Sequence, residues 1–153
     1  MKKTMIKRYS FFIWTLLIFY IFLVGCNKEV IPHDYTFKGE NELWKAELRV
    51  KGKEIFTKVN IRLEYDSESE STFSLAYKGD IEELKIIKNL TYSYEGSAGG
   101  GESSMKFDSP PTKKVFTSNS SSKGGAIYNK DDVIKFIIEV NGIESSFNLV
   151  NDK

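Results

Sequence analysis

This 153-residue chain has one cysteine and one histidine, the residue types that most often serve as the thiol nucleophile and as the general base. A nucleophilic serine or cysteine usually needs a histidine as its base, and the only histidine in the sequence is His33, next to Pro32 in a short polar stretch. We interpret His33 as a solvated linker residue. The serines lie in loop-like stretches and form no Ser-x-x-Lys motif with supporting elements. We therefore predict no catalytic residue.

Carboxylates gather at two places in the sequence. Asp66, Glu68 and Glu70 alternate within one polar run, and the pair Asp131 and Asp132 precedes the last apolar segment. Carboxylates beside strands are usually solvated and protect strand edges. A weak calcium site and a glycosidase pair are the alternatives. Because the chain has no histidine cluster and no Cys-x-x-Cys motif, we expect no metal site and no cofactor.

Glycines and aromatic residues offer two further kinds of site. Gly99, Gly100 and Gly101 are not followed by the Lys-Ser/Thr pair of a phosphate-binding loop, so we predict a mobile connection there. Trp44, Tyr92 and Tyr94 occupy alternating positions that favour a hydrophobic core over a carbohydrate-stacking surface. In a separate, loop-like segment, Tyr128 is the aromatic residue that we least expect in the core.

The first 25 residues differ from the rest of the chain. Residues 1–10 contain four basic and no acidic side chains, and residues 11–24 form an apolar run. This run is shorter than the stretch of about 20 residues that spans a bilayer. We therefore predict that residues 1–25 are a signal peptide, whose basic end stays in the cytoplasm.

The segment Leu23-Val24-Gly25-Cys26 resembles the lipobox of bacterial lipoproteins. The resemblance implies cleavage between Gly25 and Cys26 and a diacylglycerol group on the Cys26 thiol. Two acyl chains give stable anchoring, whereas one chain binds a membrane only marginally. We expect an outward-facing protein held at the cell membrane through Cys26. The alternative is a free Cys26 thiol at the end of an uncleaved anchor.

Removing the leader changes the charge of the protein. The whole chain has a formal net charge of +1, but without the four basic leader residues 18 basic side chains face 21 acidic ones, a net charge of −3. Nucleic-acid binding needs a basic surface. We therefore expect no nucleic-acid partner.

The mature chain begins with a predicted tether over residues 26–33, and we place a single folded domain over residues 34–150. Apolar and charged residues alternate over residues 44–51, 59–65 and 72–78, which predicts three strands. We expect Gly52 and the polar run over residues 66–71 to be turns between them.

The second half of the domain continues the β pattern. Residues 80–88 fit a helix with a capping box or a strand, and we favour a strand after Lys85. Loops are predicted at residues 99–101 and 117–125, with short strands between them around residues 105–107 and 115–116. The last strands alternate on either side of Asn141-Gly142, the pair that a type I′ hairpin turn demands.

Seven or eight short strands without a convincing helix predict an all-β domain. We expect a single antiparallel β-sandwich, either immunoglobulin-like or a partly open barrel.

Three segments carry a resemblance to a known group of proteins. They read GENELWKAEL at residues 39–48, YKGD at residues 77–80 and DVIKFIIEVNGIESSFNL at residues 132–149. Together they are similar to small lipoproteins of Gram-positive bacteria, over about residues 35–149, although Val140 stands where a Trp is expected. These proteins have no assigned activity, so the resemblance implies location and fold but no catalytic residue.

The sequence thus favours a non-catalytic binding or accessory lipoprotein at the cell surface, with a partner in the membrane or the cell wall. The alternative is a cell-wall-directed enzyme or a carbohydrate-binding module. A self-protection or sensory lipoprotein bound to one membrane partner is a third interpretation.

Overall fold

The structure is a computed structural model that describes residues 28–152. The signal peptide over residues 1–25 and the lipidation site at Gly25 and Cys26 lie outside the described residues. The described part contains eight strands and one short 3-10 helix: β1 (Lys28–Glu40), β2 (Trp44–Val59), β3 (Arg62–Tyr77), η1 (Ile81–Ile86), β4 (Asn89–Gly96), β5 (Gly99–Lys106), β6 (Val115–Lys123), β7 (Val133–Val140) and β8 (Ile143–Asn151). In residues 28–152, no helix has the length and apolar character needed to cross a membrane.

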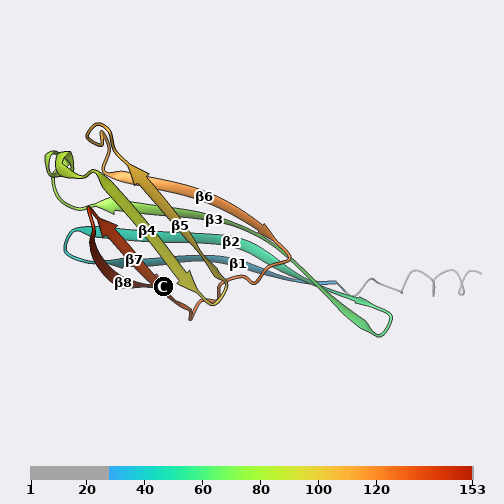
Figure 1. Cartoon of the computed structure of the whole chain (residues 1–153). Coiled ribbons are helices and arrows are strands. Elements are labelled where there is room, and N and C mark those ends of the chain that lie inside the picture. Colours follow the sequence, from blue (N-terminus) through green and yellow to red (C-terminus); the bar gives the residue numbers. More distant parts are fainter. Residues whose placement is uncertain (1–27, 153) are drawn as a thin grey trace, which may run out of the picture.

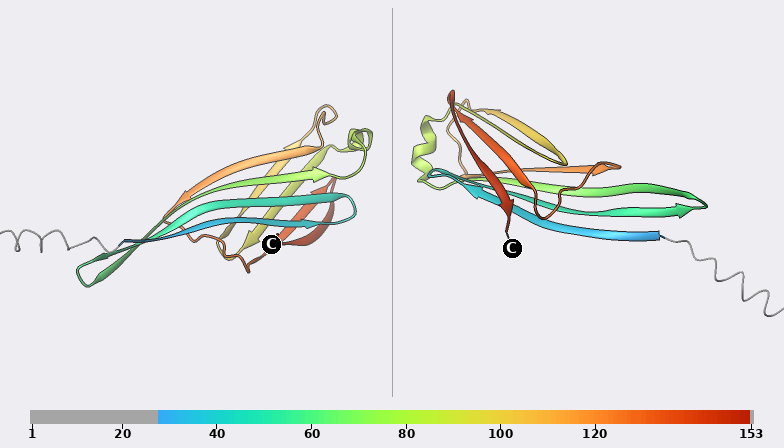
Figure 2. Two further views of the ribbon diagram at one scale, coloured as in Figure 1. Left: turned by 180° about the vertical axis from the view of Figure 1, so that it is seen from behind. Right: turned by 90° about the horizontal axis from the view of Figure 1, so that it is seen from below.

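All eight strands belong to one antiparallel sheet in the order β5-β4-β7-β8-β1-β2-β3-β6. The sheet curls into a half-barrel, so that β4, β5, β7 and β8 cross over β1, β2, β3 and β6 (Figures 1 and 2). The prediction of an antiparallel all-β domain with seven or eight strands is confirmed. The strands form one continuous sheet rather than the two sheets of an immunoglobulin-like sandwich.

The tether prediction is wrong from Lys28 onward, because residues 28–33 are the first half of β1. They pair with β2 in an unbroken register from Lys28 opposite Thr57 to Glu40 opposite Lys45. The pairing satisfies the backbone polar groups that a tether would leave to water. The folded unit thus begins at least six residues before the predicted start at residue 34.

Strands β2 and β3 form one long hairpin, and both turns predicted inside it are wrong. Gly52 pairs with Ser69 in mid-strand, where a Cβ at residue 52 would lie 2.7 Å from the Glu68 carbonyl oxygen. The polar run over residues 66–71 is extended as well, and Lys53 lies 3.0 Å from Glu68 on the opposite strand. Glycine here permits close backbone approach, and the alternating charges form cross-strand pairs.

The two loops predicted from glycine and serine content are largely strands. Gly99, Gly100 and Gly101 open β5, and residues 117–123 belong to β6. A Cβ at residue 101 would come within 2.7 Å of the Tyr94 ring, so this aromatic side chain covers the glycine backbone of the neighbouring strand. Backbone pairing with β4 and β3 therefore outweighs the weak strand preference of these residues.

Residues 80–88 contain neither a capping box nor an early strand. The 3-10 helix η1 occupies Ile81–Ile86, and its preceding residue, Asp80, makes no side-chain capping bond. Strand β4 begins at Asn89, which is three residues later than the start that we predicted directly after Lys85. The Asn141-Gly142 hairpin is confirmed, with positive φ angles of 50° and 86° at the two turn residues.

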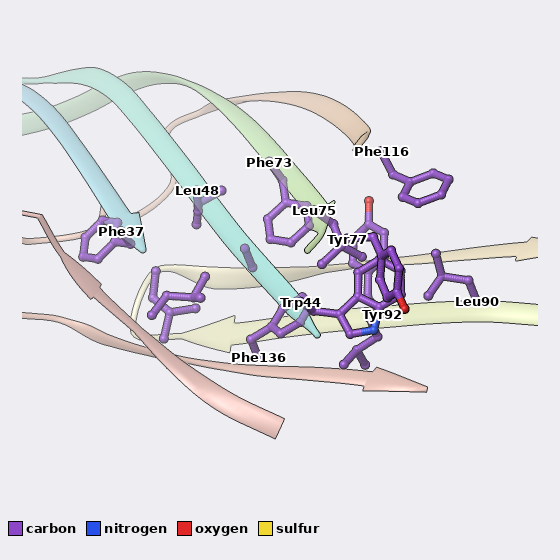
Figure 3. Close-up of a cluster of buried hydrophobic side chains, with 14 of the residues drawn as sticks. Phe37, Trp44, Leu48, Phe73, Leu75, Tyr77, Leu90, Tyr92, Phe116 and Phe136 are labelled. Carbon is purple, nitrogen blue, oxygen red and sulfur yellow. The ribbon is translucent and has the colours of Figure 1, made fainter. Parts of the chain in front are cut away.

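An aromatic stack joins the two halves of the curled sheet. Phe73 on β3 lies 4.8 Å from Tyr92, 5.0 Å from Tyr94 and 5.6 Å from Phe136, measured between ring centroids at near-parallel angles. Figure 3 shows Phe73, Tyr92 and Phe136 within the buried cluster. Stacked rings add to the free energy gained from burying their area. The stack therefore holds β4 and β7 over β3.

The predicted core position of the aromatic residues is confirmed for Trp44 and Tyr92, which are buried, and Tyr94 is partly buried against the same core. The expectation that Tyr128 stays outside the core is wrong. Tyr128 is buried, its ring centroid lies 5.7 Å from that of Phe37, and its hydroxyl donates a hydrogen bond to the Gly99 carbonyl. A polar tip that finds an acceptor lets a tyrosine from a connecting segment enter a core.

Candidate functional site

An apolar cleft opens at the end of the half-barrel where η1 and the turns β1–β2 and β7–β8 meet, which is the end on the left in Figure 1. We call it the distal cleft. It has a volume of about 520 Å³. Its walls are formed by Asn41, Glu42, Leu43, Trp44, Tyr77, Glu83, Ile86, Ile87, Val140, Asn141, Ile143 and Ser145.

The distal cleft combines a buried floor with an exposed apolar rim. Trp44 and Tyr77 are buried, and their ring centroids lie 5.0 Å apart. Leu43, Ile86 and Ile143 stand around them with 52%, 76% and 77% of their side-chain surface exposed. Exposed aliphatic side chains that are grouped around a concavity mark interaction sites more often than scattered ones do. This arrangement suits an apolar ligand group.

Asn141 fixes one wall of the distal cleft. Its side-chain oxygen accepts hydrogen bonds from the backbone N–H groups of Lys88 at 2.8 Å and Asn89 at 3.1 Å, and its amide nitrogen donates to the Ile86 carbonyl at 3.0 Å. One turn residue thus satisfies three backbone groups after η1. The segment that carries Ile86 is therefore tied to the β7–β8 hairpin.

The Asn41 side chain holds the opposite wall of the distal cleft in the same way. Its side-chain oxygen accepts from the N–H groups of Leu43 at 3.0 Å and Trp44 at 2.7 Å, and its amide nitrogen lies 3.2 Å from the Ser145 hydroxyl. The first two bonds shape the β1–β2 turn, and the third links it to β8. Both walls are thus held by asparagine side chains, which makes the cleft largely preformed.

The polar groups inside the distal cleft include a paired tyrosine and glutamate. The Tyr77 hydroxyl donates a hydrogen bond to the Glu83 carboxylate. This bond, with burial and the negative charges of Glu83 and Asp80, raises the pKa of Tyr77 to about 12. Tyr77 therefore stays protonated at physiological pH and acts as a hydrogen-bond donor rather than as a base.

A second polar cluster surrounds His33 where the sequence predicted a solvated linker. His33 is buried on β1, with its Nε2 atom 3.0 Å from Glu54, and its Nδ1 atom has no hydrogen-bond partner among residues 28–152. The Tyr65 hydroxyl lies 3.1 Å from the same carboxylate. The linker interpretation of His33 is wrong, because His33 pairs with Gly52 of β2 as part of the sheet and its ring is buried.

The His33 cluster lies beside a hydrogen bond that attaches the β6–β7 connection to β3. Ser67 is buried, and its hydroxyl donates to the Gly125 carbonyl at 2.5 Å. Because this hydroxyl already has an acceptor, Ser67 has a structural role in this arrangement. No signal in the sequence predicted the partners of His33 and Ser67, since these are 21 and 58 positions away.

The predicted carboxylate sites are scattered. Glu68 lies between Lys53 at 3.0 Å and Lys123 at 3.8 Å, and these cations hold its pKa below the usual range. Asp132 accepts hydrogen bonds from the Asn129 N–H and the Ser97 hydroxyl, so it stabilises a turn. Within residues 28–152, no group of three or more His, Cys, Asp or Glu side chains is placed to hold a metal ion.

A larger hollow of about 680 Å³ lies over β2, β3 and β6. Serines and the charged side chains of Lys51, Lys53, Glu68 and Lys123 line most of it. Since ligand sites are mostly apolar with a few oriented polar groups, the distal cleft is the stronger candidate.

No protein-family model, curated protein or solved structure matches this chain.

Proposed function

We propose that this protein is an outward-facing, lipid-anchored binding protein that acts without catalysis and uses the distal cleft as its binding surface. The observation that carries the proposal is the cleft itself, in which three exposed aliphatic side chains surround the buried Trp44 and Tyr77. A leader with a lipobox at Cys26 supplies the anchor.

The position of the distal cleft within the fold supports this role. β1 runs from Lys28, two residues after Cys26, to Glu40, next to the cleft. Thirteen extended residues span roughly 40 Å at about 3.3 Å each. A lipid on Cys26 would therefore hold one end of the domain at the membrane and present the cleft well outside it.

The chemistry of the distal cleft favours an apolar segment of a partner over a sugar. Trp44 packs at tilted angles against Tyr77 and Phe116 and is only 3% exposed, so it offers no open ring face, and Tyr92 is buried in the core. Sugars bind by stacking on exposed aromatic faces, whereas the rim of this cleft is aliphatic. The preferred occupant is an apolar side chain or short segment of a membrane or cell-wall protein, oriented by Asn41 and Glu83.

In-cell cross-linking of the full chain, followed by mass spectrometry, tests the proposal. Ile143→Asp and Ile86→Asp place a charge on the rim of the cleft at exposed positions. Val133→Asp is the matched control, because Val133 is 56% exposed and lies at the other end of β7.

We expect a discrete cross-linked partner with the parent chain and with Val133→Asp, and at least a tenfold loss of it with each rim variant. Equal capture by all four chains would show that the distal cleft is not the binding surface. Turnover of a cell-wall glycan or ester that one carboxylate or serine substitution abolishes would overturn the non-catalytic role.

The anchor has its own test. We expect Cys26→Ser to leave an unprocessed precursor at the membrane, because the lipobox chemistry requires the thiol. Normal processing of this variant, read from the mass of the mature N-terminus, would contradict the lipobox assignment.

A further inference from the structure

The β2–β3 hairpin projects beyond the rest of the half-barrel and ends in a narrow tip (Figure 1). We define the hairpin tip as residues 57–64, which include the turn at Asn60 and Ile61. Among the described residues, β1 reaches only Thr57 at the base of the tip, and the pairing of β6 with β3 ends at Glu68. In consequence, the tip has no core behind it.

The hairpin tip carries three aliphatic side chains that are exposed to solvent. Ile61 is fully exposed at the turn, Leu63 is 65% exposed, and Val59 is 44% exposed. These three residues lie within five consecutive positions. Leu63 pairs opposite Lys58, and Val59 pairs opposite Arg62. Because successive pairs point to opposite faces of a sheet, Leu63 and Val59 lie on opposite faces of the narrow ribbon. A hollow at the base of the tip is lined by Lys28, Glu29, Phe56, Lys58 and Leu63, and Val59 and Ile61 lie outside it.

The chain leads from the hairpin tip directly to the predicted lipid. Lys28 pairs with Thr57, and Ile61 is four residues further along β2 and its turn. Cys26 precedes Lys28 by two residues, and two trans peptide units limit the distance between their Cα atoms to about 7.6 Å. A lipid on Cys26 therefore brings this end of the molecule to the membrane surface.

The charge at this end fits an anionic membrane. Lys58 and Arg62 flank the exposed aliphatic side chains, and Lys28 lies on the neighbouring strand. Among residues 28–152, none of these three cations has a carboxylate oxygen within 4.0 Å. Glu64 within the tip and Glu29 next to Lys28 are the acids beside these three cations. The mature chain as a whole is acidic, so an anionic surface attracts the tip and repels the remainder.

We infer that the hairpin tip inserts Ile61, with Val59 and Leu63, into the interfacial region of an anionic lipid bilayer. This inference rests on the proposed anchor at Cys26. The tip and the lipid then make two points of contact, and the contact sets the orientation of the domain. It keeps the distal cleft directed away from the membrane.

Bromolipid quenching of tryptophan fluorescence tests the contact in the full chain. Ile61→Trp places the probe at the tip, and Ile143→Trp is the matched control at the exposed rim of the distal cleft. Each chain is reconstituted in vesicles of equal parts phosphatidylglycerol and phosphatidylcholine with brominated acyl chains. The parent chain, measured in parallel, corrects for Trp44 and, in any precursor that keeps the leader, for Trp14. The mass of the Cys26 peptide reports lipidation independently.

We expect Ile61→Trp to be quenched at least threefold more than Ile143→Trp. Adding Lys58→Glu and Arg62→Glu to the tip probe should remove at least half of that difference. Equal quenching at residues 61 and 143 overturns the insertion, whatever the state of Cys26. Strong quenching at residue 61 without lipid on Cys26 supports the tip contact and overturns the anchor. Protection of residue 61 from aqueous iodide without bromolipid quenching would indicate a protein or second copy on the tip, which also overturns the insertion.

Discussion

The two ends of the half-barrel both expose aliphatic side chains, but they expose them on opposite kinds of surface. At the distal cleft, Leu43, Ile86 and Ile143 surround a concavity whose floor is the core residue Trp44. At the hairpin tip, Val59 and Ile61 stand on a narrow ribbon with no core behind them.

The two ends differ in how much of the fold is needed to hold their exposed side chains in place. The distal cleft is built from five separate elements, namely β2, β3, η1, β7 and β8, and asparagine side chains bind its walls together. The hairpin tip needs only the pairing of two consecutive strands. A ligand pocket requires fixed walls, whereas a lipid surface adapts to the group that enters it. Substitutions at the two ends should therefore differ most in their effect on stability.

The largest effect is expected for Trp44→Ala in the floor of the distal cleft. Replacing a buried large aromatic residue with alanine costs about 3–5 kcal/mol, because apolar contacts are lost and a cavity remains. Trp44 packs against Tyr77 and Phe116 at centroid distances of 5.0 and 6.5 Å. Urea unfolding of the purified chain, followed by far-UV circular dichroism, measures the loss. A loss below about 1 kcal/mol would show that the cleft floor is not part of the core.

The next prediction concerns the pH dependence that Tyr77 gives to the distal cleft. The pKa of Tyr77 rises from its ordinary value of 10.0 to about 12 in the folded protein. A raised pKa stabilises the fold below pH 10, and the contribution disappears as the pH rises from about 10 to about 12.

We therefore expect Tyr77→Phe to flatten the decline in unfolding free energy between pH 9 and pH 12. Burial is the main cause that raises the pKa of Tyr128 to about 12. Tyr128 remains in this variant and therefore preserves part of the slope. Ile61→Ser at the hairpin tip removes no titratable group, so it is the control and should leave the slope unchanged. Identical slopes for parent and Tyr77→Phe would contradict the assigned environment of Tyr77.

The sequence predicts elements well where local chemistry and tertiary pairing agree. The last hairpin could be predicted from Asn141 and Gly142 alone, because both residues adopt the positive φ that the turn requires. Gly52 and the run over residues 66–71 carry equally strong turn composition, yet they lie in mid-strand. There the deciding contacts are cross-strand partners such as Lys53 and Glu68, which alternation along one segment does not reveal.

The candidate site shows the same limit more strongly. Alternation identified Trp44 as a core residue, but not as the floor of a cleft. The cleft exists because the ends of β2, β3 and β7 converge with η1, and this depends on the strand order β7-β8-β1-β2-β3. His33 was misread for a related reason, since its burial comes from pairing with a segment about 20 residues away.

A matched pair of asparagines separates turn geometry from wall building. Asn60 and Asn141 both have positive φ, at 57° and 50°, but only Asn141 makes side-chain hydrogen bonds to backbone groups of another element. Glycine keeps the backbone conformation and removes the side chain. We expect Asn141→Gly to lose about 1–2 kcal/mol of unfolding free energy. Asn60→Gly should change it by less than about 0.5 kcal/mol, and equal losses would contradict the wall-building role of Asn141.

The smallest effect on stability is expected at the hairpin tip, and this near absence of effect is informative. Exposed substitutions away from caps and networks stay within about 0.5 kcal/mol, so Ile61→Ser with Leu63→Thr should leave the urea midpoint unchanged. Aliphatic residues that add nothing to folding and have no core behind them need another reason to be there. If this double variant instead loses more than about 1 kcal/mol, the tip packs as part of the fold. The contrast with the distal cleft would then be one of degree, and lipid would no longer be required to explain why Ile61 is exposed.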